Sequence, residues 1–178
     1  MTIDLLDLYS RASAWTNEKV AAAAGDLDAP TPCEDWDVRT LLDHMLETQR
    51  YFLGAARGED VSPPSPTPPE LITNDPRADF ANVRDQMLRS FDEPGVLAET
   101  GPALGIAFSD TLLHGWDLAR AAGGDATMPD GLPAAAYEMI HGRFTEEERN
   151  GVFKPEVAVG ADASPQARLL AYTGRSPD

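Results

Sequence analysis

The chain has 178 residues, of which 42% are hydrophobic and 25% charged; these values predict one globular domain over residues 1–178 and argue against disorder of the whole chain. The formal net charge of −16, from 30 acidic and 14 basic residues, repels phosphate backbones and anionic lipid, so no nucleic-acid partner is expected. The single cysteine, Cys33, excludes an intrachain disulfide, and no apolar stretch approaches the ~20 residues that cross a bilayer. Because the N-terminus also lacks a cationic segment followed by an apolar one, we expect a cytoplasmic protein without a membrane partner.

Two helices are predicted in the first third of the chain. Apolar side chains recur at three- and four-residue steps over residues 2–24, and Gly25 ends that pattern. Residues 31–36 are typical of a turn. Asp37 then provides a suitable N-cap for a helix over 38–56.

A proline-rich connector over residues 58–74 separates these helices from the rest. It contains five prolines, which cannot sit in a helix interior. A stiff segment of this kind is suited to joining two helices that are not close neighbours. Asp75 and Pro76 then supply a cap and a first helical residue, and Pro94-Gly95 ends that third helix.

The second half of the chain predicts two more long helices and a tail. A helix over about 102–122 follows a short irregular stretch, and a fifth helix covers about 133–148. The tail has an extended piece at 156–159 and a short helix that begins near Ser164-Pro165. No strand pattern is long enough to build a sheet, so the prediction is an all-α, antiparallel helical bundle with a long crossover and short C-terminal additions.

Three side chains on two of these helices form a candidate metal site. Asp110 and His114 are four residues apart, so they stack on one helical face, where a carboxylate and an imidazole can reach the same small cation. His44 shares its helical face with apolar residues and is expected to point inward. Two imidazoles and a carboxylate from facing helices suit zinc or a similar first-row ion, and they leave positions for water or substrate.

Spacing alone leaves ordinary readings of the same residues open. A lone inward histidine such as His44 is more often a core residue satisfied by one hydrogen bond. Asp110 can simply pair with a protonated His114 on the surface.

The neighbours of these residues also have a structural and a functional reading. Asp43 and Asp117 adjoin the histidine stretches but lie off the histidines' helical faces. Asp117 can orient a metal ligand, although a local cap or pair is the preferred reading. Arg120 can face a substrate carboxylate or pair with an acid, and the second is preferred.

The sequence also gives expectations for four further side chains. Cys33 precedes a helix start, where a thiolate is favoured, but a buried inert thiol is the preferred reading. Trp36 and Trp116 are expected to be core anchors near the site. His141 lies beside an acidic stretch, which predicts a solvated or rim residue and not a ligand.

Two stretches of the sequence resemble a known superfamily. The stretch from Thr31 to His44 (TPCEDWDVRTLLDH) and the stretch from Leu113 to Ala121 (LHGWDLARA) are similar to the two signature stretches of the DinB-like metalloproteins. The closer resemblance is to their actinobacterial branch, which includes the N-terminal domain of mycothiol-dependent maleylpyruvate isomerase. The tail sequences FKPEVAV and LLAYTGR also resemble the end of many uncharacterised members of that branch.

The resemblance implies a four-helix bundle whose metal is held by residues matching His44, Asp110 and His114. Many members of the superfamily have histidine at the position of Asp110, and the isomerase has glutamate. Aspartate is shorter, which leaves the ion more exposed or shifted. The resemblance implies zinc in the thiol-using branch and nickel as an alternative.

The function that the resemblance implies is a metal-dependent reaction of a small-molecule substrate with a low-molecular-weight thiol such as mycothiol, as a thiol transferase or isomerase. We expect the cavity to be bordered by His44, His114 and the proline-rich connector. A metal-dependent hydrolase and a non-catalytic metal-binding or stress-response protein remain as alternatives, and a homodimer is the expected form of any self-assembly. The 178 residues contain no match to the second domain of the isomerase, which helps form its active site, so maleylpyruvate isomerisation itself is not expected.

Overall fold

The computed structural model describes residues 4–33 and 35–177. Within these residues the chain forms seven helices and no strand, which confirms the predicted all-α class. None of the described helices has the length and apolar character needed to cross a membrane. The helices are α1 (Leu5–Ala23), α2 (Val38–Ala56), α3 (Pro76–Phe91), α4 (Val96–Ala121), α5 (Leu132–Ile140), α6 (Glu146–Val152) and α7 (Pro165–Tyr172).

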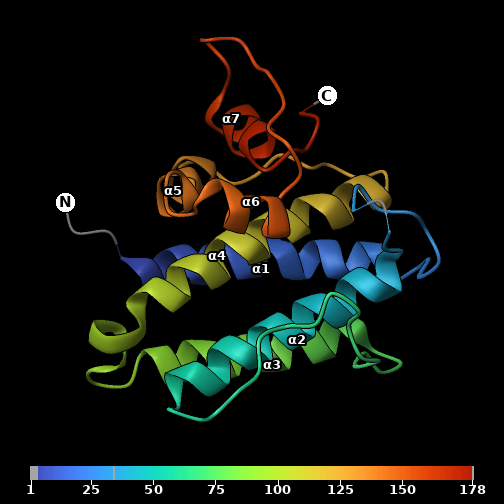
Figure 1. Cartoon of the computed structure of the whole chain (residues 1–178). Coiled ribbons are helices and arrows are strands. Elements are labelled where there is room, and N and C mark those ends of the chain that lie inside the picture. The colour runs from blue at the N-terminus through green and yellow to red at the C-terminus, as the bar shows by residue number, and fades with distance from the viewer. Residues whose placement is uncertain (1–3, 34, 178) are drawn as a thin grey trace.

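The four longest helices form a bundle in which both α1 and α2 pack against α3 and α4. α1 and α4 run in one direction, and α2 and α3 run in the opposite direction (Figure 1). α5 packs on α4, and α7 packs on α5. The arrangement is the DinB-like four-helix fold with short C-terminal additions, as predicted.

The proline-rich segment joins α2 and α3, which pack on each other, so the expectation that it joins helices that are not close neighbours is wrong. It is long because the two helices are parallel and the chain must return along the bundle (Figure 1). α2 has 19 residues and is therefore about 28 Å long. Two acidic side chains of α2 anchor the returning chain. Asp43 Oδ1 accepts hydrogen bonds from the N–H groups of Leu71 (2.6 Å) and Ile72 (2.8 Å), and Glu47 accepts one from the N–H group of Ser65 (3.1 Å).

Aspartate caps fix where the first three helices begin. Asp37 and Asp75 each accept a hydrogen bond from the third N–H group of their helix, at 2.8 Å and 3.0 Å, as the sequence predicted. Asp4 caps α1 in the same way. The predicted start of the first helix at Thr2 lies outside the described residues.

The beginning of α4 corrects the prediction. The helix starts at Val96 instead of near residue 102, and Pro102 lies inside it. A proline removes one backbone hydrogen bond and is best tolerated in the first turn, which is why the sequence predicted a later start. Here Gly101 and Leu104, close to the proline on either side, are buried in the bundle.

The fifth predicted helix is also corrected, because α5 and α6 replace the single helix expected over residues 133–148. Gly142 has a φ of +69°, a left-handed conformation that favours glycine and ends the helical path. Thr145 then begins α6 in a capping box with Glu148. This Thr-x-x-Glu signal was present in the sequence, but the apolar residues that precede it, through Phe144, favoured one continuous helix.

The C-terminal tail folds back onto α5. The extended piece predicted at 156–159 belongs to no strand, although the N–H group of Val157 donates to the carbonyl oxygen of Ala171 (3.0 Å). α7 begins where predicted, with Ser164 as its cap.

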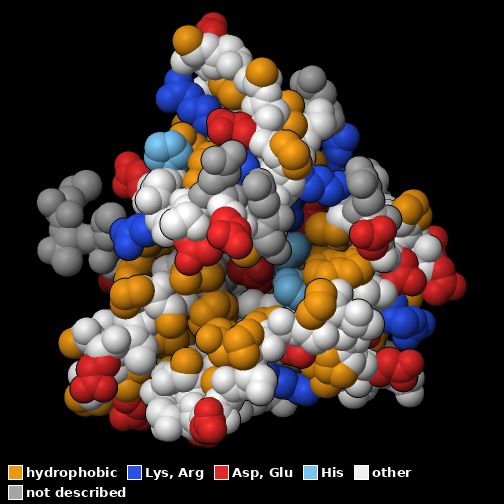
Figure 2. All heavy atoms as spheres, in the orientation of Figure 1, with side chains coloured by type: hydrophobic (Ala, Val, Ile, Leu, Met, Phe, Trp, Pro, Cys, Tyr) orange, Lys and Arg blue, Asp and Glu red, His pale blue; other side chains and the backbone are white. Residues whose placement is uncertain are grey.

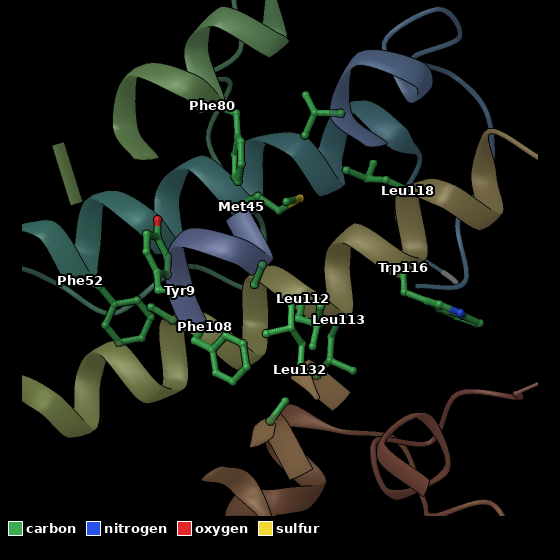
Figure 3. Packing of buried hydrophobic residues seen from close by; sticks show 14 of the residues in the cluster. Tyr9, Met45, Phe52, Phe80, Phe108, Leu112, Leu113, Trp116, Leu118 and Leu132 are labelled. Carbon is green, nitrogen blue, oxygen red and sulfur yellow. The ribbon is translucent and has the colours of Figure 1, made fainter. Parts of the chain in front are cut away.

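The core fills the space between the four long helices and continues beneath the C-terminal additions (Figure 3). Its largest fully buried side chains come from all of these parts: Tyr9, Leu41, Met45, Phe80, Met87, Phe91, Phe108, Leu112 and Leu132. Because α2 and α4 are neighbours in this core, polar side chains on their facing surfaces are brought close to one another.

Candidate metal centre

A short turn before α2 brings an aromatic ring to the face between α2 and α4. Backbone hydrogen bonds from Val38 N to Ala29 O (3.0 Å) and from Thr31 N to Trp36 O (3.3 Å) close this turn. The turn places the Trp36 ring 4.6 Å from the ring of His44, between centroids. The predicted turn is therefore present, with Glu34 of the same stretch outside the described residues.

The three predicted ligands meet between α2 and α4. Asp110 Oδ1 lies 3.3 Å from His114 Nε2, one turn further along α4, and 3.8 Å from His44 Nε2 on α2. The two imidazole rings are 5.0 Å apart and nearly perpendicular. Because one ligating atom from each residue lies within 4.8 Å of the others, a single small cation can be reached by all three.

The hydrogen bonding of this cluster is incomplete. Among the described residues, three buried side-chain atoms lack a partner, and two of them are His44 Nδ1 and Asp110 Oδ2. Buried polar atoms in native proteins are normally paired, and an ion or an ordered water is a common reason for an exception. An oxygen donor beside two imidazole nitrogens fits a first-row divalent ion.

Neighbouring charges shift the pKa values of Asp110 and His114. Burial favours the neutral acid of Asp110, but the imidazoles of His114 and His44 outweigh it and hold the pKa of Asp110 well below its usual range. Burial alone would lower the pKa of His114, yet the Asp110 carboxylate and the other hydrogen-bond partners raise it well above its usual value. In the metal-free chain Asp110 is therefore an anion and His114 carries a proton. A metal ion bound at this position would displace that proton.

Asp117 forms a local i, i+3 pair on α4, as the preferred reading expected, and its partner is the predicted ligand His114. Its Oδ2 lies 2.9 Å from Nδ1 of His114, the ring nitrogen that faces away from Asp110. The guanidinium of Arg175 donates to both oxygens of Asp117, at 2.9 Å and 2.7 Å. Burial favours the neutral acid, but Arg175 and His114 hold the pKa of Asp117 well below its usual range. Asp43, by contrast, points to the crossover and away from the site, as predicted.

A second group of potential ligands, Cys33, His114 and Asp117, also lies within 4.8 Å. Its atoms are already engaged with one another and with Arg175: the Cys33 thiol donates to Asp117 at 3.4 Å, and both oxygens of Asp117 accept from Arg175. The predicted set of His44, Asp110 and His114 is therefore the better candidate for a metal ion. Cys33 is half-buried, so its thiol is less enclosed than the preferred reading expected.

The remaining predicted residues lie around or away from the site. Trp116 is buried in the core, whereas Trp36 is half-buried at the edge of the site, with its ring 6.4 Å from that of His114. The guanidinium of Arg120 lies 5.5 Å above the Trp116 ring. His141 is exposed, stacks on Tyr137 at 4.6 Å and belongs to neither group of potential ligands.

The site opens to the surface. Figure 2 shows two histidine side chains at the bottom of a hollow between α4 and α2, with hydrophobic side chains on both sides. The side chains of His44, Asp110 and His114 are 15%, 21% and 11% exposed, so a small molecule can touch them without unfolding the bundle. Ile106 lies one turn before Asp110 on α4 and is 42% exposed. A separate crevice at the C-terminal ends of α1 and α4 is lined mainly by alanine, and Asp26 is its one acidic side chain among the lining residues.

Arg175 was not among the residues that the sequence singled out. It is 58 positions from Asp117, and no helical spacing connects the two. Only the resemblance of the tail pointed to this stretch. The structure adds Arg175, together with Asp117, to the surroundings of the predicted ligands.

Comparison with known proteins gives a family match and two relatives. Residues 10–119 match the family model described as the mycothiol maleylpyruvate isomerase N-terminal domain. Two uncharacterised proteins from strains of Mycobacterium tuberculosis are each 26% identical over 167 residues, an alignment that covers 86% of this chain and 87% of the relative. No solved structure matches the chain. The matched residues contain all three predicted ligands and end before the C-terminal additions.

Proposed function

The chain belongs to the mycothiol maleylpyruvate isomerase N-terminal domain family, and from this premise we propose that it is a metal-dependent enzyme in which a low-molecular-weight thiol such as mycothiol reacts with a small electrophilic molecule. The observation that carries the proposal is the convergence of His44, Asp110 and His114 within 4.8 Å, with part of each side chain exposed to solvent. The family match supports a thiol as co-substrate, and the geometry of the three residues supports a metal site.

The number of ligands supports a catalytic role over a purely structural one. Structural zinc sites have four protein ligands, whereas catalytic sites keep three and leave one position for a reactant. His44, Asp110 and His114 are three, and the hollow above them provides access. Zinc in this position would act as a Lewis acid that lowers the pKa of a thiol or water, so that a nucleophile exists at neutral pH.

The charge of the ligand set favours an anionic fourth ligand. Two neutral imidazoles and one carboxylate contribute a single negative charge, so a divalent ion among them leaves one positive charge for a further ligand. The nearby carboxylate of Asp117 does not change this count, since it is neutralised by Arg175. A thiolate carries this negative charge, as does the hydroxide that a metal-dependent hydrolase would use; the family match favours the thiolate.

Each residue then has a defined part in the reaction. His44 and His114 would hold the ion through ring nitrogens and Asp110 through a carboxylate oxygen, and the Trp36 ring lies against one side of His44. In a transfer, the sulfur forms a bond to the electrophilic carbon, the bond to the leaving group breaks with its electron pair, and the proton of the thiol goes to solvent. In an isomerisation, the same sulfur adds to the carbon and later leaves it.

Turnover by the zinc-loaded protein tests the proposal. Mycothiol and other low-molecular-weight thiols are combined with a panel of electrophiles that includes a chloronitrobenzene, and a His114→Ala variant serves as the control. A thiol-dependent rate above that of the control is expected. Hydrolysis without thiol would replace the transferase by a hydrolase. Zinc binding without any turnover would leave a non-catalytic metal-binding protein.

A further inference from the structure

A buried ion pair joins the C-terminal tail to the candidate metal centre. Arg175 and Asp117 form a two-pronged contact, with Nε 2.9 Å from Oδ1 and Nη2 2.7 Å from Oδ2. The side chain of Asp117 is fully buried and that of Arg175 is 12% exposed. A planar guanidinium fixes both the position and the rotation of a carboxylate, which an ammonium group cannot do.

The local fold of the tail aims Arg175 at this position. Gly174 follows α7 with a φ of +78°, and a Cβ there would lie 2.8 Å from backbone atoms of Lys154. Only glycine fits such a conformation and such a close approach. The N–H group of Arg175 then donates to the carbonyl oxygen of Leu170 at 2.9 Å, which fixes the backbone from which the guanidinium reaches Asp117.

The carboxylate of Asp117 in turn fixes the ring of His114. Its Oδ2, 2.9 Å from Nδ1 of His114, holds that nitrogen as the donor, so Nε2 is left pointing at Asp110 and His44. A ligand histidine is commonly held by a carboxylate in this manner. Without Arg175, Asp117 would keep its contacts with His114 and Cys33 but would lose its strongest charge partner, so the buried carboxylate would turn, take up a proton or admit water.

We propose that Arg175 is a positioning residue of the metal centre, acting through Asp117 on the ring of His114. This inference rests on the proposed function, because that proposal identifies the three predicted ligands as a metal centre. The contacts among Arg175, Asp117 and His114 do not depend on it. The inference also assigns a role to residues outside the family match, which ends at residue 119. The C-terminal additions thus contribute to the site and do not merely cover the bundle.

A double-mutant cycle tests whether Arg175 acts on His114 through Asp117. The measured quantity is the zinc affinity of the single and double variants. Arg175→Met is expected to lower the affinity of the full chain by about 10- to 100-fold, the range found when the support of a metal ligand is removed. Arg175→Lys, which keeps the charge without the fork, is expected to fall between this variant and the wild type. If Arg175 acts through Asp117, Arg175→Met has little further effect in an Asp117→Asn background. Additive losses would overturn the proposal, as would unchanged affinity in Arg175→Met. Should the Met variant not fold, the same cycle is run with Arg175→Lys.

Arg168→Met is the matched control. Arg168 also belongs to the C-terminal additions, but it is exposed and donates to the carbonyl oxygen of Ala161. Its replacement is expected to leave zinc affinity within about twofold of the wild type, because it does not touch Asp117. An equal loss in the Arg168 and Arg175 variants would mean that general docking of the tail, and not the contact with Asp117, supports the site.

An NMR measurement on the metal-free protein tests the positioning role of Arg175 independently of the proposed function. With ¹⁵N-labelled histidine, the Nδ1–H proton of His114 should give a downfield resonance that exchanges slowly with solvent, because it is buried against a carboxylate. The resonance should broaden or disappear in Arg175→Met and persist in Arg168→Met. A wild-type protein that shows this pattern but binds no zinc or nickel would refute the metal centre and keep the positioning role. A resonance unchanged in Arg175→Met would refute the positioning role.

Discussion

The carboxylate of Asp110 lies 3.3 Å from Nε2 of His114, one turn further along the same helix, and the pair faces His44 on the neighbouring helix. The helical repeat makes the first relationship predictable, whereas the second requires the bundle. If these residues bind zinc, the ion ties α2 to α4 and stabilises the folded state. At a free zinc concentration of about 100 times Kd, the gain is about 2.7 kcal/mol, or a rise in Tm of roughly 5–10 °C for a chain of this size.

This zinc-induced rise in Tm should vanish in Asp110→Asn, because a neutral amide replaces the one anionic ligand at constant size. His141→Ala should keep the full rise, since His141 is exposed and outside the ligand group. Differential scanning calorimetry with and without zinc measures both. A full rise in Asp110→Asn would show that zinc binds elsewhere on this acidic surface.

Asp43→Ala should loosen the crossover. Its carboxylate accepts hydrogen bonds from the N–H groups of Leu71 and Ile72, and both donors would lose their partner. We expect a loss of about 1–3 kcal/mol in the free energy of unfolding and faster proteolysis between α2 and α3. Glu47→Ala, which removes a single bond to Ser65, should have the smaller effect. Cleavage rates that do not differ between the Asp43 variant and the wild type would mean that proline stiffness alone holds this segment.

Gly115→Ala should destabilise the bundle. A Cβ at Gly115 would lie 2.7 Å from Cζ3 of Trp15 and would also collide with the hydroxyl of Thr16, so α1 and α4 must move apart. A cost of about 1–3 kcal/mol is expected from overpacking, even though alanine is the better helix former. Gly105→Ala is the matched control in the same helix. Its Cβ would meet only the flexible end of Met139, at 3.2 Å, so denaturant unfolding should show little loss or a gain.

The cap of α2 should give the protein a small acid-sensitive increment of stability. Hydrogen bonds from Thr40 hold the pKa of Asp37 below its usual value. A group whose pKa is lower in the folded state stabilises the fold above its unfolded pKa of about 4 and loses that contribution as the pH falls through the folded value. At pH 7, Asp37→Ala should cost about 1 kcal/mol, and the cost should shrink below pH 4. In urea unfolding at both pH values, Asp37→Asn, which can still cap, should lack most of this pH dependence.

Helix positions followed from the sequence where the signals are local. Asp37 and Asp75 are caps as predicted, and the bounds of α2 agree with the apolar pattern. The errors at α4 and α5 arose where one local signal competed with another: Pro102 against the packing of its neighbours, and Gly142 against the periodicity around it. The parallel pairing of α2 with α3 depends on the path of the crossover, which no helical spacing encodes.

In the candidate site, too, local spacing could be predicted from the sequence and long-range contacts could not. Asp110 and His114 could be paired from a spacing of four, and the inward face of α2 pointed to His44. The contact of Asp117 with Arg175 spans 58 residues and depends on the turn at Gly174, so it appears only when the tail is folded. The geometry shows that these three residues can reach one ion.

The position of Trp36 has a practical consequence. Its indole ring lies 4.6 Å from the ring of His44 and 6.4 Å from that of His114, at the half-buried edge of the hollow. Indole emission depends on nearby charge and polarity, so the fluorescence of Trp36 should report directly on what binds between the two imidazoles. Trp15 and Trp116 also fluoresce. A Trp36→Phe variant would give their emission alone, which can then be subtracted. The chain therefore carries its own optical probe, and ligands can be screened with the unlabelled protein before any substrate is known.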